Sequence, residues 1–301
     1  MSESAPTRRG VHERLAAIGP PAPVEFNPGR TLKLRVEFVR QIKRRRTQFA
    51  LLVLIALPIL MAAAFKLGGG ASGNGRDAAP ELVTLATSGG ANFAMFTEFA
   101  SVGFLLVVIV ALFCGDTVAS EASWASLRYL LAMPVPRARL LWQKLVVALG
   151  LSFAANIVLP AWALIVGTVV FGSAPARSPL GGTFSFTESL WRLAIMVGYV
   201  CAQSLVVAAL AFLLSVSVDN PLGAVGGATL LVVVSNILDQ ITALDPYRHF
   251  LPTHFQYSWL DALGPSIVWD DMLRGTGLAL IYAAVLFAVA WLRFDRKDIT
   301  S

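Results

Sequence analysis

The chain has 301 residues, of which 56% are hydrophobic and 14% are charged, whereas about a quarter of the residues in a soluble domain carry charge. Several uncharged stretches are about 20 residues long, the length that a helix needs to cross the hydrocarbon core of a bilayer. These runs do not alternate apolar and polar residues as membrane β-strands do, so the composition predicts a polytopic helical membrane protein and argues against a soluble domain.

The formal net charge is +6, and the positions of the basic residues explain it without nucleic acid. Of the 24 Lys and Arg residues, 11 precede the first predicted span, four lie between residues 115 and 144, and three lie in the last ten residues. Basic residues gather on the cytoplasmic side of membrane proteins. We therefore expect both termini in the cytoplasm, the chain in the inner membrane of a cell, and no nucleic-acid partner.

The N-terminal part divides into two segments. Residues 1–30 are polar and Pro-rich, and we expect a disordered cytoplasmic tail. Residues 31–48 mix six apolar residues with eight charged ones. The apolar side chains cover a wide face of a helical wheel, although their early alternation would also suit a strand. We favour an amphipathic helix on the inner leaflet; the alternative is a basic flank that only sets the orientation.

Six transmembrane helices are predicted in an all-α permease domain that covers residues 49–293, followed by a cytoplasmic tail at 294–301. The expected spans are 49–67, 93–114, 140–171, 189–217, 222–238 and 275–292. Pro160 is expected to bend the third span. The segment 239–274 holds five Asp and six aromatic residues, which predicts a position along the outer membrane interface. Its acidic residues suit either a cationic substrate or a solvated loop.

Glu98 lies near the outer end of the second predicted span. A carboxylate at this depth either is exposed at the interface or faces a wet cavity, and a charge inside a membrane favours a functional role. We therefore name Glu98 as a possible residue of a substrate pathway.

A charged segment, GDTVASEASWASLRYLLAMPVPRARLLWQK, occupies residues 115–144 between two long apolar runs. It contains a predicted helix at about 116–133, on which Glu121 and Arg128 are about two turns apart and share a face. An apolar stripe at helical spacing is formed by Trp124, Leu127 and Leu131. Two prolines end the helix, Pro134 and Pro136. Such a helix has an apolar side for the membrane and a charged side for a docking partner.

This segment resembles the loop between the second and third spans of the permease subunits of ATP-binding-cassette (ABC) exporters of the type-two class. The resembling run is EASWASLRYLLAMPVPRARLLWQK at 121–144. The six-span layout after a basic amphipathic helix also fits, so the resemblance covers roughly Thr31 to the C-terminus. It implies a coupling helix seated in a cleft of a separate ATPase subunit. Two copies of that ATPase would serve a dimer of this chain, or of this chain with a similar one, and would bind the ATP and Mg.

The resemblance also assigns residues to the contact with the ATPase. Carried over by position, Glu121, Trp124 and Arg128 would lie at or beside the cleft, and the following turn would be anchored by Arg137 and Arg139. A lesser contact in the next cytoplasmic turn would come from Asp219 and Asn220. The alternative is that Glu121 and Arg128 only solvate a cytoplasmic loop while Trp124 anchors it to lipid.

The remaining chemistry of the sequence is sparse. A phosphate-binding loop needs Gly-Lys followed by Ser or Thr, and none of the five lysines follows a glycine. The three histidines are too scattered for a convincing metal site. We expect a transport subunit that is not itself an enzyme and that exports a drug, a lipid-like or another amphipathic molecule. The alternatives are a membrane scaffold or immunity protein, and a gradient-driven carrier, which would usually have more ionisable residues in its spans.

Overall fold

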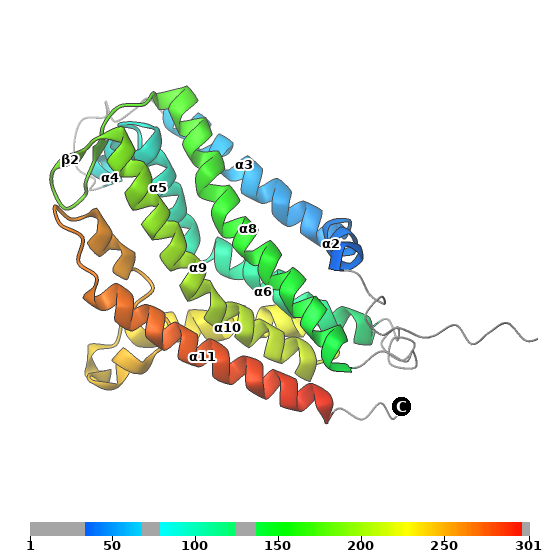
Figure 1. Ribbon diagram of the computed structural model, residues 1–301. Coiled ribbons are helices and arrows are strands. Elements are labelled where there is room, and N and C mark those ends of the chain that lie inside the picture. The colour runs from blue at the N-terminus through cyan, green and yellow to red at the C-terminus, as the bar shows by residue number, and fades with distance from the viewer. Residues whose placement is uncertain (1–33, 68–78, 124–136, 297–301) are drawn as a thin grey trace, which may run out of the picture. The chain divides into compact units, whose positions relative to one another are not determined.

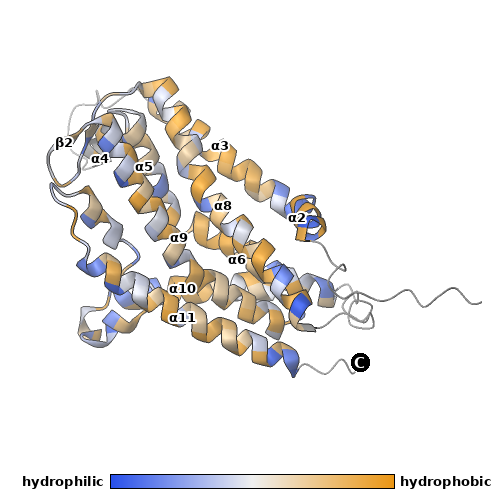
Figure 2. Ribbon diagram, viewed as in Figure 1, coloured by the Kyte–Doolittle hydropathy of each residue, from blue (hydrophilic) through white to orange (hydrophobic). Residues whose placement is uncertain are grey.

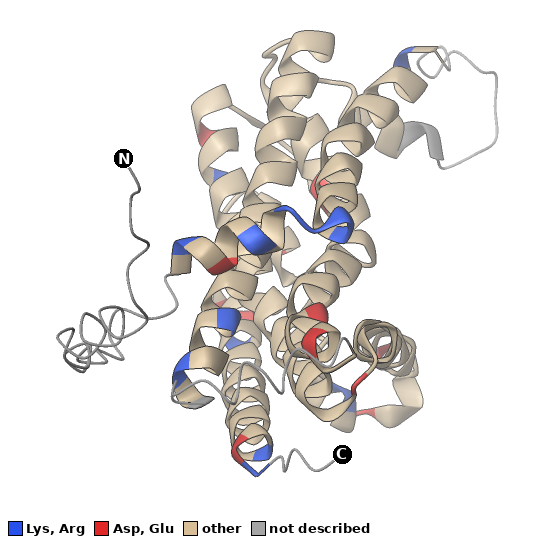
Figure 3. Cartoon of the chain, turned by 90° about the vertical axis from the view of Figure 1, so that its right-hand side faces the viewer, with Lys and Arg blue, Asp and Glu red and all other residues tan. Residues whose placement is uncertain are grey.

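In the computed structural model, residues 34–67, 79–123 and 137–296 are described, all of them within a unit that covers residues 32–301. Six helices in these ranges are long and apolar enough to cross a membrane (Figure 1). Figure 2 shows that most of their length is hydrophobic, and Figure 3 shows how few charged residues interrupt it. The predicted six-helix architecture is confirmed at this level, whereas the predicted tails at 1–30 and 297–301 lie outside the described residues.

Helix α2 (Leu34–Ile42) is followed by a short turn and by α3 (Arg45–Leu67). The predicted amphipathic helix at 31–48 is therefore too long at its C-terminal end. Helix α3 begins at Arg45, four residues before the predicted span at 49–67, which it contains. Basic side chains can start a membrane helix because their long stems reach polar partners at its end. Four large apolar residues of α2 are exposed, which suits a position at the membrane interface: Leu34, Val36, Phe38 and Val39.

The second predicted span is not one helix. The short helix α4 (Ala79–Ala86) leads to α5 (Gly90–Val102), and α6 (Leu105–Ser123) follows after a turn at Gly103 and Phe104. A Cβ atom at Gly103 would lie 2.8 Å from the Tyr257 hydroxyl, so glycine admits this close contact at the turn. Helix α6 continues nine residues beyond residue 114, the predicted end of the span, into the segment that was predicted as a separate helix at about 116–133.

Helix α8 (Arg137–Phe171) has 35 residues and contains Pro160 without interruption. Because proline has no amide hydrogen, one backbone hydrogen bond is lost there. The bend expected at Pro160 stays a prediction. The second half of α8 packs closely along α5. At this contact a Cβ atom on Gly167 would lie 2.9 Å from the Phe93 side chain, so the glycine allows the two backbones to approach.

A two-stranded antiparallel hairpin lies in the predicted turn at 172–188. It pairs β1 (Ala176–Arg177) with β2 (Thr183–Phe184). Gly181 and Gly182 make the return with φ of 98°, a conformation that side chains disfavour. The side chain of Asn92 on α5 accepts from the Arg177 amide at 2.9 Å and donates to the Arg177 carbonyl at 2.7 Å. The hairpin is thereby fixed to the start of α5.

The last three long helices are α9 (Phe186–Ser217), α10 (Pro221–Asp239) and α11 (Asp270–Asp295). Ser185 caps α9 and Asn220 caps α10, each accepting a backbone hydrogen bond from the first turn. Helix α9 lies at the centre, in contact with α6, α8, α10 and α11. The ends of α6, α9 and α11 meet the starts of α8 and α10 on one side, which we call the basic end.

The segment between α10 and α11 lies at the other end and contains three short 3₁₀ helices: η2 (Thr242–Leu244), η3 (Tyr247–Phe250) and η4 (Ser258–Leu263). It is tied to the helices through backbone groups. The Tyr199 hydroxyl donates to the Phe255 carbonyl at 2.6 Å. The Arg192 guanidinium donates to the Ala262 carbonyl at 2.5 Å and stacks 3.8 Å above the Phe184 ring. The segment therefore packs on the helix ends, and its predicted membrane-interface position remains a prediction.

Candidate functional site

An ion-pair cluster lies at the basic end, where α2, α6 and α8 meet (Figure 3). We call it the ion-pair clamp, and its members are Glu37, Arg40, Arg44, Arg46, Asp116, Glu121 and Lys144. At its centre the Lys144 Nζ lies 2.5 Å from the Glu121 Oε1, and the side chains are 3% and 1% exposed. Since both charges are withdrawn from water, each depends on the other for compensation.

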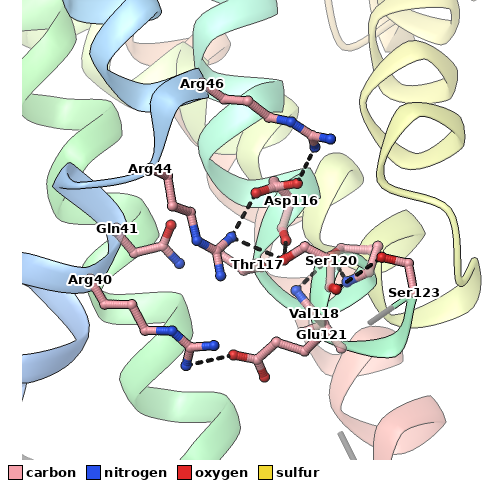
Figure 4. Close-up of polar contacts among 12 residues, drawn as sticks. Arg40, Gln41, Arg44, Arg46, Asp116, Thr117, Val118, Ser120, Glu121 and Ser123 are labelled. Atoms are coloured by element: carbon pink, nitrogen blue, oxygen red, sulfur yellow. Dashed lines mark hydrogen bonds and ion pairs between the residues drawn. The ribbon is translucent and has the colours of Figure 1, made fainter. Parts of the chain in front are cut away.

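Helix α2 contributes the next layer of the clamp. The Arg40 Nη1 lies 2.9 Å from the Glu121 Oε1, and the Lys144 Nζ lies 3.3 Å from the Glu37 Oε1 (Figure 4 shows the Arg40 pair). Burial alone would raise the pKa of Glu37, but the charges of Lys144 and Arg40 outweigh it and hold that pKa below its ordinary value. Glu37 is therefore ionised in the clamp at neutral pH.

The start of α3 is fixed through Asp116. This carboxylate accepts from the Arg44 Nη1 at 2.6 Å and pairs with the Arg46 Nη1 at 2.6 Å, one oxygen for each arginine (Figure 4). Arg44 also donates to the Ser120 hydroxyl at 3.0 Å. On the opposite side of α6, the Ser215 hydroxyl of α9 accepts from the Val118 amide at 3.0 Å. The end of α6 is consequently attached both to the α2–α3 junction and to α9.

Glu121 does not have the position that the sequence suggested. It was expected on a charged face turned toward a partner, but it is buried, belongs to α6 and pairs inside the chain with Lys144 and Arg40. The segment was interpreted as solvated because it is charged, and the compensating basic residues come from parts of the chain as distant as 81 positions. The missed residues are Arg40, Arg44, Arg46 and Lys144; the basic run before the first span was the available signal.

The other predicted contact residues are only partly described. Trp124 and Arg128, the side chain of Arg137 and the rest of the predicted coupling helix at 124–133 lie outside the described residues. Arg139 is half-buried in the first turn of α8. Asp219 is exposed beside Asn220, whose side chain accepts from the Leu222 amide at 3.0 Å and so has a helix-capping role. Arg139 thus lies at the start of α8, and Asp219 and Asn220 lie at the start of α10, both at the basic end.

Glu98 is 0% exposed on α5, and neither carboxylate oxygen has a hydrogen-bond partner among the described residues. The expected exposure at the interface was therefore wrong. The alternative, a wet cavity, stays a prediction, and α8 and α9 both pack against the helix that carries the side chain. A carboxyl in such a site is retained at a cost in stability.

The two nearby histidines form a chain of contacts instead of a metal site. His254 Nδ1 lies 2.5 Å from Asp239 Oδ1, and His254 Nε2 lies 2.9 Å from His249 Nδ1. Among the residues that the structure describes, no three His, Cys, Asp or Glu side chains gather in a way that could hold a metal ion.

Comparisons with known proteins place this arrangement in a family. The family model described as "Protein of unknown function (DUF2705)" matches residues 81–300, most of the chain. The chain belongs to this family. It is also 25% identical over 218 residues to a Bacillus subtilis (strain 168) protein named "Uncharacterized membrane protein YdbK", covering 69% of this chain and 84% of that protein. Together with the six apolar helices, this relative establishes a helical membrane protein.

The family match divides the ion-pair clamp. Asp116, Glu121 and Lys144 lie inside the matched residues 81–300. The basic residues of α2 and of the start of α3 precede them. The DUF2705 region thus contains the buried Glu121–Lys144 pair between α6 and α8, and the N-terminal helices add the outer charges to it.

Proposed function

We propose that this chain is the permease subunit of an ATP-driven exporter of the ABC type. In this proposal it lies in the inner membrane of a cell with its basic end in the cytoplasm. It acts as a dimer with itself or a similar chain, and two copies of a separate ATPase subunit bind beneath. The observation that carries the proposal is the buried Glu121–Lys144 ion pair, which joins the two ends of the segment that resembles a coupling helix.

The geometry suits transmission of force from a bound partner. Residues 124–136 connect α6 to α8, and Glu121 and Lys144 lie on the two sides of this connection. Arg40 adds α2 to the same pair, and Asp116 adds the start of α3 through Arg44 and Arg46. A displacement of the connecting segment would therefore move four helices together.

The motor would be a different polypeptide. None of the five lysines has the Gly-Lys context of a phosphate-binding loop. ATP and Mg are accordingly assigned to the partner, and this chain supplies the pathway and the coupling contact. Glu121 acts in the coupling by holding α6 to α8. The contacts with the ATPase are assigned by the resemblance to Trp124 and Arg128, and further ones to Arg137, Arg139, Asp219 and Asn220.

The proposal is tested by purifying the tagged chain from its native membrane and measuring the ATPase activity of what accompanies it. A cassette ATPase in stoichiometric amount is expected with the wild type. Arg128→Glu should lower its recovery or activity at least tenfold. The matched control is Arg274→Glu, since Arg274 is a 73% exposed residue at the opposite end and its reversal should change neither. Absence of an ATPase from the wild-type preparation would overturn the proposal in favour of a scaffold.

One observation favours a second candidate, a carrier driven by an ion gradient. A carboxyl enclosed among membrane helices without a partner is typical of proton pathways, and Glu98 is such a group. The carrier predicts that Glu98→Gln abolishes transport and that depletion of ATP at a constant proton gradient does not. The exporter predicts instead that depletion of ATP abolishes transport even at a constant proton gradient.

A further inference from the structure

A cavity of about 370 Å³ lies between α6, α9, α10, α11 and residues 251–256 of the segment that joins α10 to α11. Its walls are mainly Val and Leu side chains, such as Val107 on α6, Leu210 on α9 and Leu231 on α10. A few polar residues lie among them. Two of these, Asn156 and Gln256, have a property that the others lack.

The amide of Asn156 has one possible orientation. Its Nδ2 donates to the Ser152 carbonyl at 2.9 Å. Because a carbonyl only accepts, the reversed amide would place two acceptors against each other, so the nitrogen is fixed on that side. Asn156 is 0% exposed, and its Oδ1 has no partner in the described part of the chain. Asn156, a residue of the cavity wall, therefore carries a buried acceptor without a donor among the described residues.

Gln256, a second residue of the cavity wall, has the same arrangement. Its Nε2 donates to the Val102 carbonyl at 3.1 Å, which fixes the amide by the same reasoning. The residue is 7% exposed, and its Oε1 is buried without a partner among the residues described. Asn156 belongs to α8, whereas Gln256 belongs to the external segment. Two independent elements thus present the same kind of unsatisfied oxygen.

We propose that this cavity is a binding site for a small apolar molecule that carries an O–H or N–H donor. Apolar side chains would contact the body of the molecule, and the donor would satisfy Asn156 Oδ1 or Gln256 Oε1. Buried acceptors without partners are costly, and ligand sites combine apolar walls with a few oriented polar groups. A volume of about 370 Å³ suits a molecule of about two fused rings.

The inference that the cavity binds such a molecule is independent of the exporter. The further inference that this molecule is the transported cargo rests on the proposed exporter function. The segment between α10 and α11 contributes residues 251–256 to the cavity wall and is attached to both helices. The Ser235 and Thr253 hydroxyls are 2.7 Å apart, and the Tyr282 hydroxyl donates to the Phe250 carbonyl at 2.7 Å. Release of a bound molecule past this segment, away from the basic end, would require its contacts with α10 and α11 to open.

The test uses two probes that differ only in the donor, 1-naphthol and 1-methoxynaphthalene. The full chain is placed in lipid nanodiscs, and binding is measured by calorimetry with empty nanodiscs as the blank. The wild type is expected to bind 1-naphthol about fivefold more tightly than its methyl ether, the ratio that one neutral hydrogen bond supplies. Equal affinities would overturn the proposal and leave the cavity as an apolar space without donor selectivity.

Variants assign the selectivity to the two amides. Asn156→Leu and Gln256→Met keep the side-chain volume and remove the acceptor, and at least one of them should bring the ratio of the two affinities close to one. Val234→Ala is the matched control, because Val234 lines the cavity, is 41% exposed and should weaken both probes equally. Preserved selectivity in both amide variants would overturn the assignment.

The outcomes for the site and for the exporter are separable. Selective binding without an accompanying ATPase would support the site and overturn the exporter. Co-purification of an ATPase, together with equal binding of the two probes by the chain, would support the exporter and overturn the site. Stimulation of ATPase activity by 1-naphthol but not by its methyl ether, lost in the responsible amide variant, would support both.

Discussion

The ion-pair clamp places three carboxylates among four basic side chains. Away from the clamp, Glu98 on α5, Asn156 on α8 and Gln256 in the segment between α10 and α11 have oxygens that lack partners among the described residues. Both regions bury polar atoms in an apolar protein. In the clamp the charges are compensated and join four helices. Around the cavity and Glu98, the polar atoms are left for another molecule or for a proton. A buried polar group therefore holds helices together when a partner compensates it, and it costs stability when it has no partner.

The largest effect is expected from Lys144→Met. This change leaves Glu121 buried and deprived of its closest counter-charge, so it should lower the free energy of unfolding by about 3–5 kcal/mol. Thermal unfolding in detergent measures the loss. In the double variant Glu121→Leu with Lys144→Met, most of the loss should be recovered, because no charge is left uncompensated. A double variant less stable than the single one would contradict this account.

A smaller loss is expected from Asp116→Asn. The substitution keeps the shape of the side chain but removes the charge that Arg44 and Arg46 share, and both arginines are partly exposed. Since water can solvate them, a loss of about 1–3 kcal/mol is expected from the charged hydrogen bonds. Arg46→Gln is the control, and should cost less than about 1 kcal/mol because Arg46 is 58% exposed.

Substitution at Glu98 should have the opposite sign. Glu98→Met replaces an enclosed carboxyl without a partner by an apolar side chain of similar length, and should raise the free energy of unfolding by about 1–2 kcal/mol. The same unfolding measurement applies, with Glu98→Gln as a control that keeps a polar group and should gain less. Destabilisation by Glu98→Met would mean that the carboxyl has a stabilising partner.

The smallest effect concerns pH. The pKa of Glu37 lies below its ordinary value of 4.5, because Lys144 and Arg40 outweigh the effect of burial. Its contribution to stability is therefore complete above about pH 4.5 and is lost as the pH falls through the lowered pKa. Between pH 7 and pH 5.5 the wild type and Glu37→Gln should differ by a nearly constant amount, and their stabilities should converge only as the pH falls below about 4.5. Convergence above pH 5 would contradict the lowered pKa.

The sequence was sufficient for the number and approximate position of the six apolar helices, because length and hydropathy determine which segments can cross a membrane. It was insufficient for the turn at Gly103, since glycine is common inside membrane helices and only the contact with Tyr257 distinguishes this one. Pro160 lies inside α8, which continues through it, and the bend predicted there stays a prediction.

The candidate site was less predictable than the fold. Glu121 and Lys144 are 23 positions apart, and their pairing depends on how α6 and α8 end and begin. The segment at 115–144 was recognised as charged, but the local pattern could not show that its first carboxylates, Asp116 and Glu121, are buried in α6. The free oxygens of Asn156 and Gln256 were invisible for a related reason, because an amide's accessible side is decided by the carbonyl that its nitrogen meets.

Helix α8 carries both regions on one continuous element. Lys144 in the clamp and Asn156 in the cavity wall are 12 residues apart, which is about 18 Å along an unbroken helix. A small tilt imposed at the first turn of α8 would therefore displace Asn156 sideways, by an amount that grows with this distance. Helix α6 offers a second unbroken path, because Glu121 in the clamp and Val107 in the cavity wall both lie on it. Motion at the basic end can thus reach the cavity from two sides.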